Sequence, residues 1–157
     1  MSERSGTFVV TTVDDESAVV QDVDTAQLHT LSTHPALDER EVLEATLSPE
    51  PPLEVVWTIE ELADRRTVDV IDSELSPTTH SLETAAELAT GELRTVERAG
   101  RGEIHLLSVP PGDVEAAAAD VIDDVETVAR AARLDAVRVE VRSDAEAGLV
   151  SVRYLPD

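Results

Sequence analysis

Arginine supplies the side chains of this chain that are best suited to binding chemistry. All twelve basic residues are arginine; eight of them lie among residues 94–157 beside 13 acidic residues, whereas residues 1–93 carry four arginines and 21 acidic residues. A guanidinium group makes two-point hydrogen bonds to phosphate or carboxylate groups, and these bonds survive salt better than diffuse charge does. The uneven distribution therefore points to the last third of the chain as the place of an anion-binding site.

Two expected strands would present several of these arginines on one surface. Residues 137–142 and residues 150–154 each alternate apolar with polar side chains. Because side chains alternate between the two faces of a sheet, we expect the arginines to project from the face opposite the valines. The candidate ligand-binding residues are the arginines of these segments, two earlier arginines and one histidine: Arg138, Arg142, Arg153, Arg94, Arg98 and His105.

The sequence leaves three interpretations of this surface open. The first is a face that binds the phosphates of RNA or a carboxylate-rich partner. The second is a solvated face on which arginine pairs with Glu97 and Glu140 across the strands. The third is a face that docks onto the acidic N-terminal part of the chain. Base stacking would require aromatic rings, and Phe8, Trp57 and Tyr154 each lie in a valine-rich segment where burial is expected.

Histidines and carboxylates give no recognised catalytic or metal-binding pattern. His29 and His34 with Asp24 do not match a ligand spacing and are expected to be solvated, and the chain has no cysteine. His105 should share the outward face with Glu103, and proton transfer would require a carboxylate and a pocket beside it. Gly100-Arg101-Gly102 is expected to be a hairpin turn rather than a phosphate loop. We therefore predict no metal, no cofactor and no catalytic residue.

The charge balance indicates where such a protein could work. The formal net charge is −22, and aromatic residues make up 2% of the chain. In molar salt the Debye length falls to about 3 Å, so that dense carboxylates hardly repel one another, and apolar burial with small side chains is strengthened. We predict a protein of a salt-accumulating halophile. No run of eighteen apolar residues occurs and residues 1–6 are polar, so we expect a cytoplasmic protein that does not associate with a membrane.

The first part of the chain is expected to contain only strands. Apolar alternation between turn residues predicts five short strands at residues 6–13, 18–23, 27–31, 41–47 and 53–62. Five short strands with a longer connection after the third favour a small β-barrel of the OB or S1-like type. We assign this barrel to residues 1–72.

The second part is expected to be an α+β sandwich. Helices are predicted at residues 81–90 and, as one long helix capped by Asp113, from residue 114 onward; strands are predicted at residues 65–71, 93–98, 103–109, 137–141 and 150–154. The order β-α-β-β-α-β-β corresponds to a ferredoxin-like fold, with two helices on one sheet face and an extra C-terminal strand. We assign a linker to residues 73–80 and the sandwich to residues 81–157, with residues 67–71 able to belong to either domain.

Several segments resemble an uncharacterised family of short acidic proteins from haloarchaea, a domain of unknown function. The segments that carry the resemblance are Gly6-Thr7-Phe8-Val9-Val10, Pro49–Trp57, Gly91-Glu92-Leu93, Glu97-Arg98-Ala99-Gly100, Ala129-Arg130-Ala131-Ala132-Arg133-Leu134 and Val150-Ser151-Val152-Arg153-Tyr154-Leu155-Pro156. The resemblance spans nearly the whole chain. It implies a halophilic, cytoplasmic protein and supplies no active residue.

These observations favour a non-catalytic binding module that uses the arginine-bearing sheet face for RNA or a ribonucleoprotein assembly. Two alternatives stay open: a protein–protein adaptor or oligomer subunit, and an enzyme acting on a small anionic ligand with His105 and nearby arginines. The sequence does not determine the oligomeric state.

Overall fold

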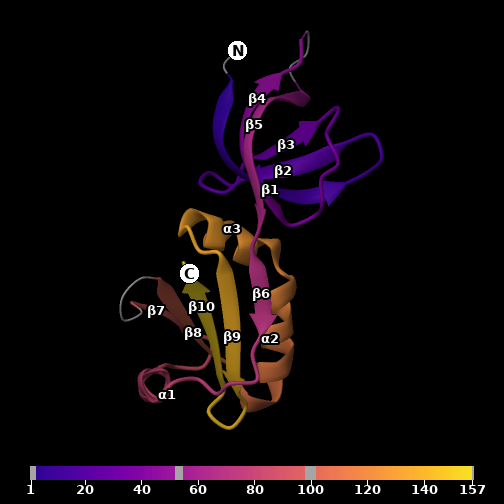
Figure 1. The fold of residues 1–157 in the computed structure, drawn as a ribbon. Helices are drawn as coiled ribbons and strands as arrows, with labels where there is room; N and C mark the ends of the chain where they lie inside the picture. The colour runs from indigo at the N-terminus through magenta and orange to yellow at the C-terminus, as the bar shows by residue number, and fades with distance from the viewer. Residues whose placement is uncertain (1–2, 52–54, 98–101, 157) are drawn as a thin grey trace. The chain divides into compact units, whose positions relative to one another are not determined.

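The computed structural model describes residues 3–51, 55–97 and 102–156 of the chain (Figure 1). The chain divides into two compact units. Unit 1 comprises Met1–Val68 and Val128–Arg133, and unit 2 comprises Asp69–Thr127 and Leu134–Asp157. Residues 69–72, and with them the segment 73–80, therefore count with unit 2.

Unit 1 is built on a five-stranded sheet that closes on itself. Its strands are β1 (Arg4–Val13), β2 (Ala18–Asp22), β3 (Leu28–Leu31), β4 (Glu41–Pro49) and β5 (Trp57–Thr67). They follow one another in the order β1-β2-β3-β5-β4, and β1 pairs with β4 to complete the ring. All neighbours are antiparallel except β3 and β5, which are parallel.

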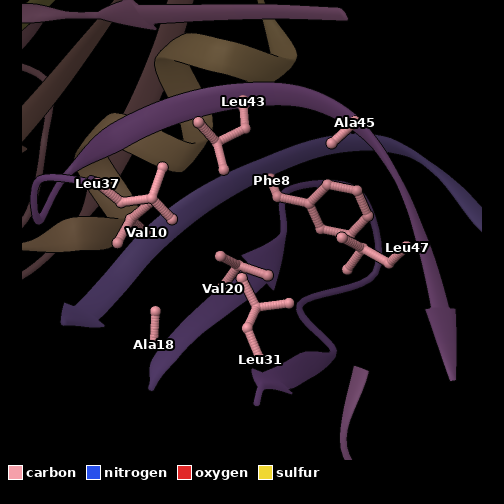
Figure 2. Close-up of a cluster of buried hydrophobic side chains, with 9 residues drawn as sticks. All are labelled: Phe8, Val10, Ala18, Val20, Leu31, Leu37, Leu43, Ala45 and Leu47. Carbon is pink, nitrogen blue, oxygen red and sulfur yellow. The ribbon is translucent and has the colours of Figure 1, made fainter. Parts of the chain in front are cut away.

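Alternate side chains of the ring point into a common apolar core (Figure 2). The period of two in these strands sends every second residue inward, and most inward residues are valine or leucine. The buried cluster consists of Phe8, Val10, Ala18, Val20, Leu31, Leu37, Leu43, Ala45 and Leu47. The alternation that predicts strands in the sequence is thus the feature that makes this core.

Unit 2 is an α+β unit whose sheet has five strands. Its elements are β6 (Asp69–Asp72), α1 (Thr79–Ala85), β7 (Leu93–Glu97), β8 (Glu103–Ser108), the 3-10 turn η1 (Pro111–Asp113), α2 (Val114–Asp123), β9 (Arg138–Asp144) and β10 (Leu149–Leu155), with α3 (Val125–Arg133) crossing the boundary between the units. The strand order is β6-β9-β10-β8-β7, and only the β6–β9 pair is parallel.

The two faces of this sheet are covered by different helices. On one face, Val139, Val141, Val150 and Val152 are buried, and α2 packs there against β9, β10 and β6. On the other face, α1 contributes Ala85 to an apolar cluster with Ile104, Leu106 and Leu149. The helix after Gly112 therefore lies across the valine side, as the sequence predicts.

Two predictions about the second part of the chain need correction. The ferredoxin-like order is not confirmed, because β6 lies at the edge of the sheet and the two helices pack on opposite faces. The predicted long helix is two helices, because Asp124 adopts an extended conformation with φ −76° and ψ 123°. Its carboxylate accepts a hydrogen bond from the Glu126 amide (2.9 Å), which starts α3 afresh.

The remaining element bounds also differ in places. Asp113 precedes α2 but makes no side-chain capping hydrogen bond. The predicted strand at residues 65–71 is divided, since β5 extends to Thr67 and β6 begins at Asp69. The predicted strand at residues 53–62 begins only at Trp57, and residues 53 and 54 lie outside the described part. In the described residues, no helix combines the length and apolar character needed to cross a membrane.

Candidate functional site

The register of unit 2 brings three of the predicted arginines to one face of the sheet. Arg138 and Arg142 lie four residues apart on β9, so that both side chains are on the same face of the sheet. Arg153 on β10 is paired with Glu140 of β9. The buried valines of both strands occupy the other face. We call the group Arg138, Glu140, Arg142 and Arg153 the arginine face.

The centre of the arginine face is an ion pair that is largely buried. The Nε of Arg142 donates to Oε1 of Glu140 at 2.5 Å, and the two side chains are 16% and 15% exposed. The Nη1 of Arg142 also donates to the carbonyl oxygen of Ser76 at 3.4 Å. The segment before α1 thus contacts the arginine face, and Arg142 is held both by Glu140 and by the carbonyl oxygen of Ser76. Its guanidinium group is fixed in direction and partly neutralised by Glu140.

Arg138 stands at the end of this face. It lies opposite Asp69 of the edge strand β6 and opposite Leu155 of β10. Its Nε is buried and makes no hydrogen bond to the described residues. A buried donor without an acceptor costs free energy that an incoming oxygen atom can recover. Arg138 is therefore a member of the face with a donor still to be satisfied.

Arg94, another of the predicted arginines, does not join this group. Arg94 on β7 has the same orientation by register, but the apolar cluster under α1 separates it from Arg142. Its guanidinium group instead pairs with Glu87 at 3.3 Å and Glu92 at 3.5 Å. Arg98 lies outside the described residues. Among the described residues, the candidate anion site therefore consists of three of the four predicted arginines.

His105 lies on the opposite face of the sheet. The expectation that His105 faces outward is wrong: the residue is buried, with 8% of its surface exposed, and its Nε2 is 3.2 Å from Oε2 of Glu103. Its ring packs at 61° to that of Tyr154, with centroids 4.9 Å apart. His105 therefore has the neighbouring carboxylate that the sequence analysis requires for proton transfer, but it cannot act together with the arginine face.

A cavity of about 430 Å³ opens between α2 and the ends of β6 and β9. Val114, Ala118 and Ile122 give it an apolar floor, while Asp72 and Glu115 stand among the polar lining residues. None of the candidate ligand-binding residues lines it. Among the described residues, no group of three or more histidine, aspartate or glutamate side chains is arranged to hold a metal ion.

One functional group that the sequence analysis places wrongly is the imidazole of His29. It was expected to be solvated, yet it is 2% exposed and lies between the rings of Phe8 and Trp57. The signal was available, because His29 lies two residues before the buried Leu31 in the same strand and therefore points to the same side. Desolvation of the buried imidazole lowers the pKa of His29. The charge of Asp22 raises this pKa, and the charge of Arg4 lowers it further.

Comparison with known proteins places the chain in context without assigning it an activity. The sequence model of a family described as "Family of unknown function (DUF5812)" matches residues 4–143. No curated protein and no solved structure is significantly similar to the chain. The function has to be argued from the geometry.

Proposed function

The chain belongs to this family of unknown function, and we propose that it is a non-catalytic binding module that holds RNA, alone or in a ribonucleoprotein assembly, through its arginine face. The observation that carries the proposal is the convergence of Arg138, Arg142 and Arg153 on one side of two paired strands. Guanidinium groups held at fixed positions recognise phosphate oxygens by two-point hydrogen bonds.

The surroundings of the arginines support binding of an anion. Arg142 is oriented by Glu140 and Ser76, and the buried Nε of Arg138 has no acceptor in the described part of the chain. A phosphate group at the face would compete with Glu140 for Arg142, and it would supply an acceptor to the Arg138 Nε if that side chain turned outward. Preorganised donors lose little side-chain entropy on binding, which favours affinity.

The ring of unit 1 supports the same class of function. We interpret it as an OB-like barrel, since it has five strands, closes on itself and includes a nine-residue loop between β3 and β4 at residues 32–40. Barrels of this type commonly bind nucleic acids. The net charge of −22 supports a cytoplasm with molar salt as the working environment, where long-range repulsion from a polyanion is screened.

The test is binding of single-stranded RNA to the full chain in molar KCl. We expect Arg138→Gln/Arg142→Gln/Arg153→Gln to bind at least about tenfold more weakly than wild type, since three charged hydrogen-bonding groups are removed. Arg94→Gln is the control for each single change in the triple variant, because it removes one guanidinium charge from the same sheet outside the arginine face. Equal binding by the triple variant and wild type, or no binding by either, would refute the proposal.

A second candidate is an enzyme in which His105 transfers a proton to or from a small anionic ligand. The observation that favours it is the 3.2 Å contact between His105 Nε2 and Glu103 Oε2 beside the Tyr154 ring. A carboxylate partner orients an imidazole for proton transfer. Addition of inorganic phosphate should then shift the His105 ring resonances in wild type and leave them unmoved in Glu103→Gln; unmoved resonances in both would remove this candidate.

A further inference from the structure

The ring of unit 1 contains a buried histidine, His29, in an apolar environment that offers its ring nitrogens no hydrogen-bond partner among the described residues. His29 is 2% exposed, and neither Nδ1 nor Nε2 has a hydrogen-bond partner in the described part of the chain. The Trp57 ring lies 4.7 Å away at 81° and the Phe8 ring 5.8 Å away at 85°. A neutral imidazole can be tolerated in such an apolar setting, whereas a charged imidazolium cannot without an acceptor.

His29 also lies beside the weakest pairing of the ring. Among the described residues, β3 and β5 share a single register pair, Leu31 opposite Trp57, with one further hydrogen bond from the Ser32 amide to the Trp57 carbonyl oxygen at 3.0 Å. By contrast, β4 and β5 pair from Glu41 and Thr67 through to Pro49 and Trp57. We call the β3–β5 pairing the seam of the ring. Trp57 thus serves both as the closing residue of the seam and as the wall of the His29 site.

Charges near His29 come from two of the neighbouring strands. The carboxylate of Asp22 on β2 favours protonation, and the guanidinium group of Arg4 on β1 opposes it. From β5 the neighbour is the uncharged indole of Trp57, and no charged group of β4 or β5 in the described residues contributes. Burial is the largest of these influences and holds the pKa of His29 below 6.5.

We propose that His29 is a proton-sensitive lock on the seam: the neutral ring holds β3 against β5 through Trp57, and protonation releases β3 and opens the ring of unit 1. The sign of the pH dependence follows from the difference between the pKa of His29 in the folded and in the unfolded state. An unfolded chain takes up the proton near pH 6.5, while the folded ring does so only at lower pH, so stability is lost as the pH falls below 6.5. One proton raises the unfolding equilibrium constant by up to about tenfold per pH unit.

The single tryptophan makes the proposal measurable in the full chain. Trp57 is the only tryptophan of the protein, so its fluorescence reports unit 1 alone. At constant molar KCl, urea unfolding followed by this signal should show a midpoint that falls between pH 7.5 and pH 5.5 in wild type. His29→Phe should remove that fall, since it fills the site with a ring that cannot be protonated.

His34 provides the matched control. It is half-buried, and hydrogen bonds to the carbonyl oxygens of Pro35 and Asp14 raise its pKa, so it stabilises the protein at low pH instead. His34→Gln should therefore keep the acid-induced loss and make it slightly steeper. A wild-type midpoint that stays level over this range, or a loss that persists in His29→Phe, would overturn the proposal.

Two measurements on wild type keep the test decisive if His29→Phe does not fold. The His29 ring resonances should titrate below pH 6.5, and titration at or above 6.5 would overturn the proposal. Hydrogen exchange of the Ser32 amide, corrected for its intrinsic pH dependence, should lose protection on acidification more than that of the Val10 amide on β1. Equal changes at the two amides would show that protonation does not act on the seam.

Discussion

Glu41 and Arg65 form a two-point ion pair between neighbouring strands of the ring. The Nε of Arg65 donates to Oε2 of Glu41 at 2.5 Å and its Nη2 donates to Oε1 at 2.8 Å. The Asp38 amide also donates to Oε1 (3.0 Å), so a nearly buried carboxylate has three donors. This pair connects the loop before β4 to the end of β5, and it determines how unit 1 responds to strong acid.

Glu41→Gln should weaken unit 1 and flatten its stability profile below pH 4.5. The hydrogen bond from Arg65 is the main reason that the pKa of Glu41 lies below its ordinary value of 4.5. A lowered carboxylate pKa stabilises the folded state above 4.5, and this contribution is lost as the pH falls through the folded-state pKa. Urea unfolding monitored at Trp57 between pH 5.5 and 3 measures it. Glu61→Gln, an exposed change on β5, the strand that carries Arg65, should leave the wild-type profile intact; identical profiles for Glu41→Gln and wild type would contradict the prediction.

Leu43→Ala should destabilise unit 1 by about 2–5 kcal/mol, because it leaves a cavity in a closely packed core. Leu43 is 1% exposed and belongs to the buried cluster of Figure 2. The exposed Leu28, at 61%, offers the control: Leu28→Ala should change stability by about 0.5 kcal/mol or less. Urea unfolding at pH 7.5 compares the two. Equal losses would mean that the ring does not have its core where the burial pattern puts it.

Gly148→Ala should cost about 2 kcal/mol or more in unit 2. Gly148 adopts φ +65°, which side chains rarely tolerate, and an added Cβ would collide with the carbonyl oxygen of Val109. Gly112→Ala is matched to it, because nothing lies within 4 Å of a Cβ at that position. Thermal unfolding followed by circular dichroism distinguishes the two variants. A Gly148→Ala protein as stable as Gly112→Ala would disprove the close approach of the two backbone segments.

Asp124→Ala should destabilise the protein by about 1 kcal/mol, whereas Asp113→Ala should have almost no effect. Both aspartates precede a helix, but only Asp124 accepts a hydrogen bond from a helix amide, that of Glu126. Calorimetry of the two variants in molar KCl makes the comparison. A larger loss of stability for Asp113→Ala than for Asp124→Ala would contradict the conclusion that Asp124, and not Asp113, caps a helix.

The sequence predicts those parts of the fold that depend on alternation along one strand. Valine and arginine alternating through residues 138–142 predict two chemically different faces, and the register of β9 and β10 places the side chains in that way. The same alternation of side chains along Leu28–Leu31 places His29 on the side of Leu31, inside the ring. The expected exposure rests on the absence of a metal-ligand spacing around His29, and that criterion says nothing about burial, whereas the strand period does.

Other features depend on contacts that a linear pattern does not contain. The position of β6 at the sheet edge follows from its parallel pairing with β9, a partner nearly seventy residues later. The break at Asp124 is decided by one side-chain hydrogen bond within an otherwise continuous helical period. Arg94 is separated from the arginine face because β8 and β10 lie between β7 and β9 in the sheet. The sequence therefore predicts that Arg138, Arg142 and Arg153 share one face of the sheet, but it does not predict that Arg94 is separated from them.

The position of β10 bears on how unit 2 is made at the ribosome. This strand is the last element of unit 2 along the chain, yet it is the middle strand of the sheet, with β9 and β8 as its neighbours. The sheet therefore cannot be joined across its middle while translation of β10 is unfinished. Until β10 has been synthesised, the edges of β8 and β9 that pair with it have no strand partner. Unpaired strand edges of this kind favour aggregation, and chaperones act on such species during synthesis.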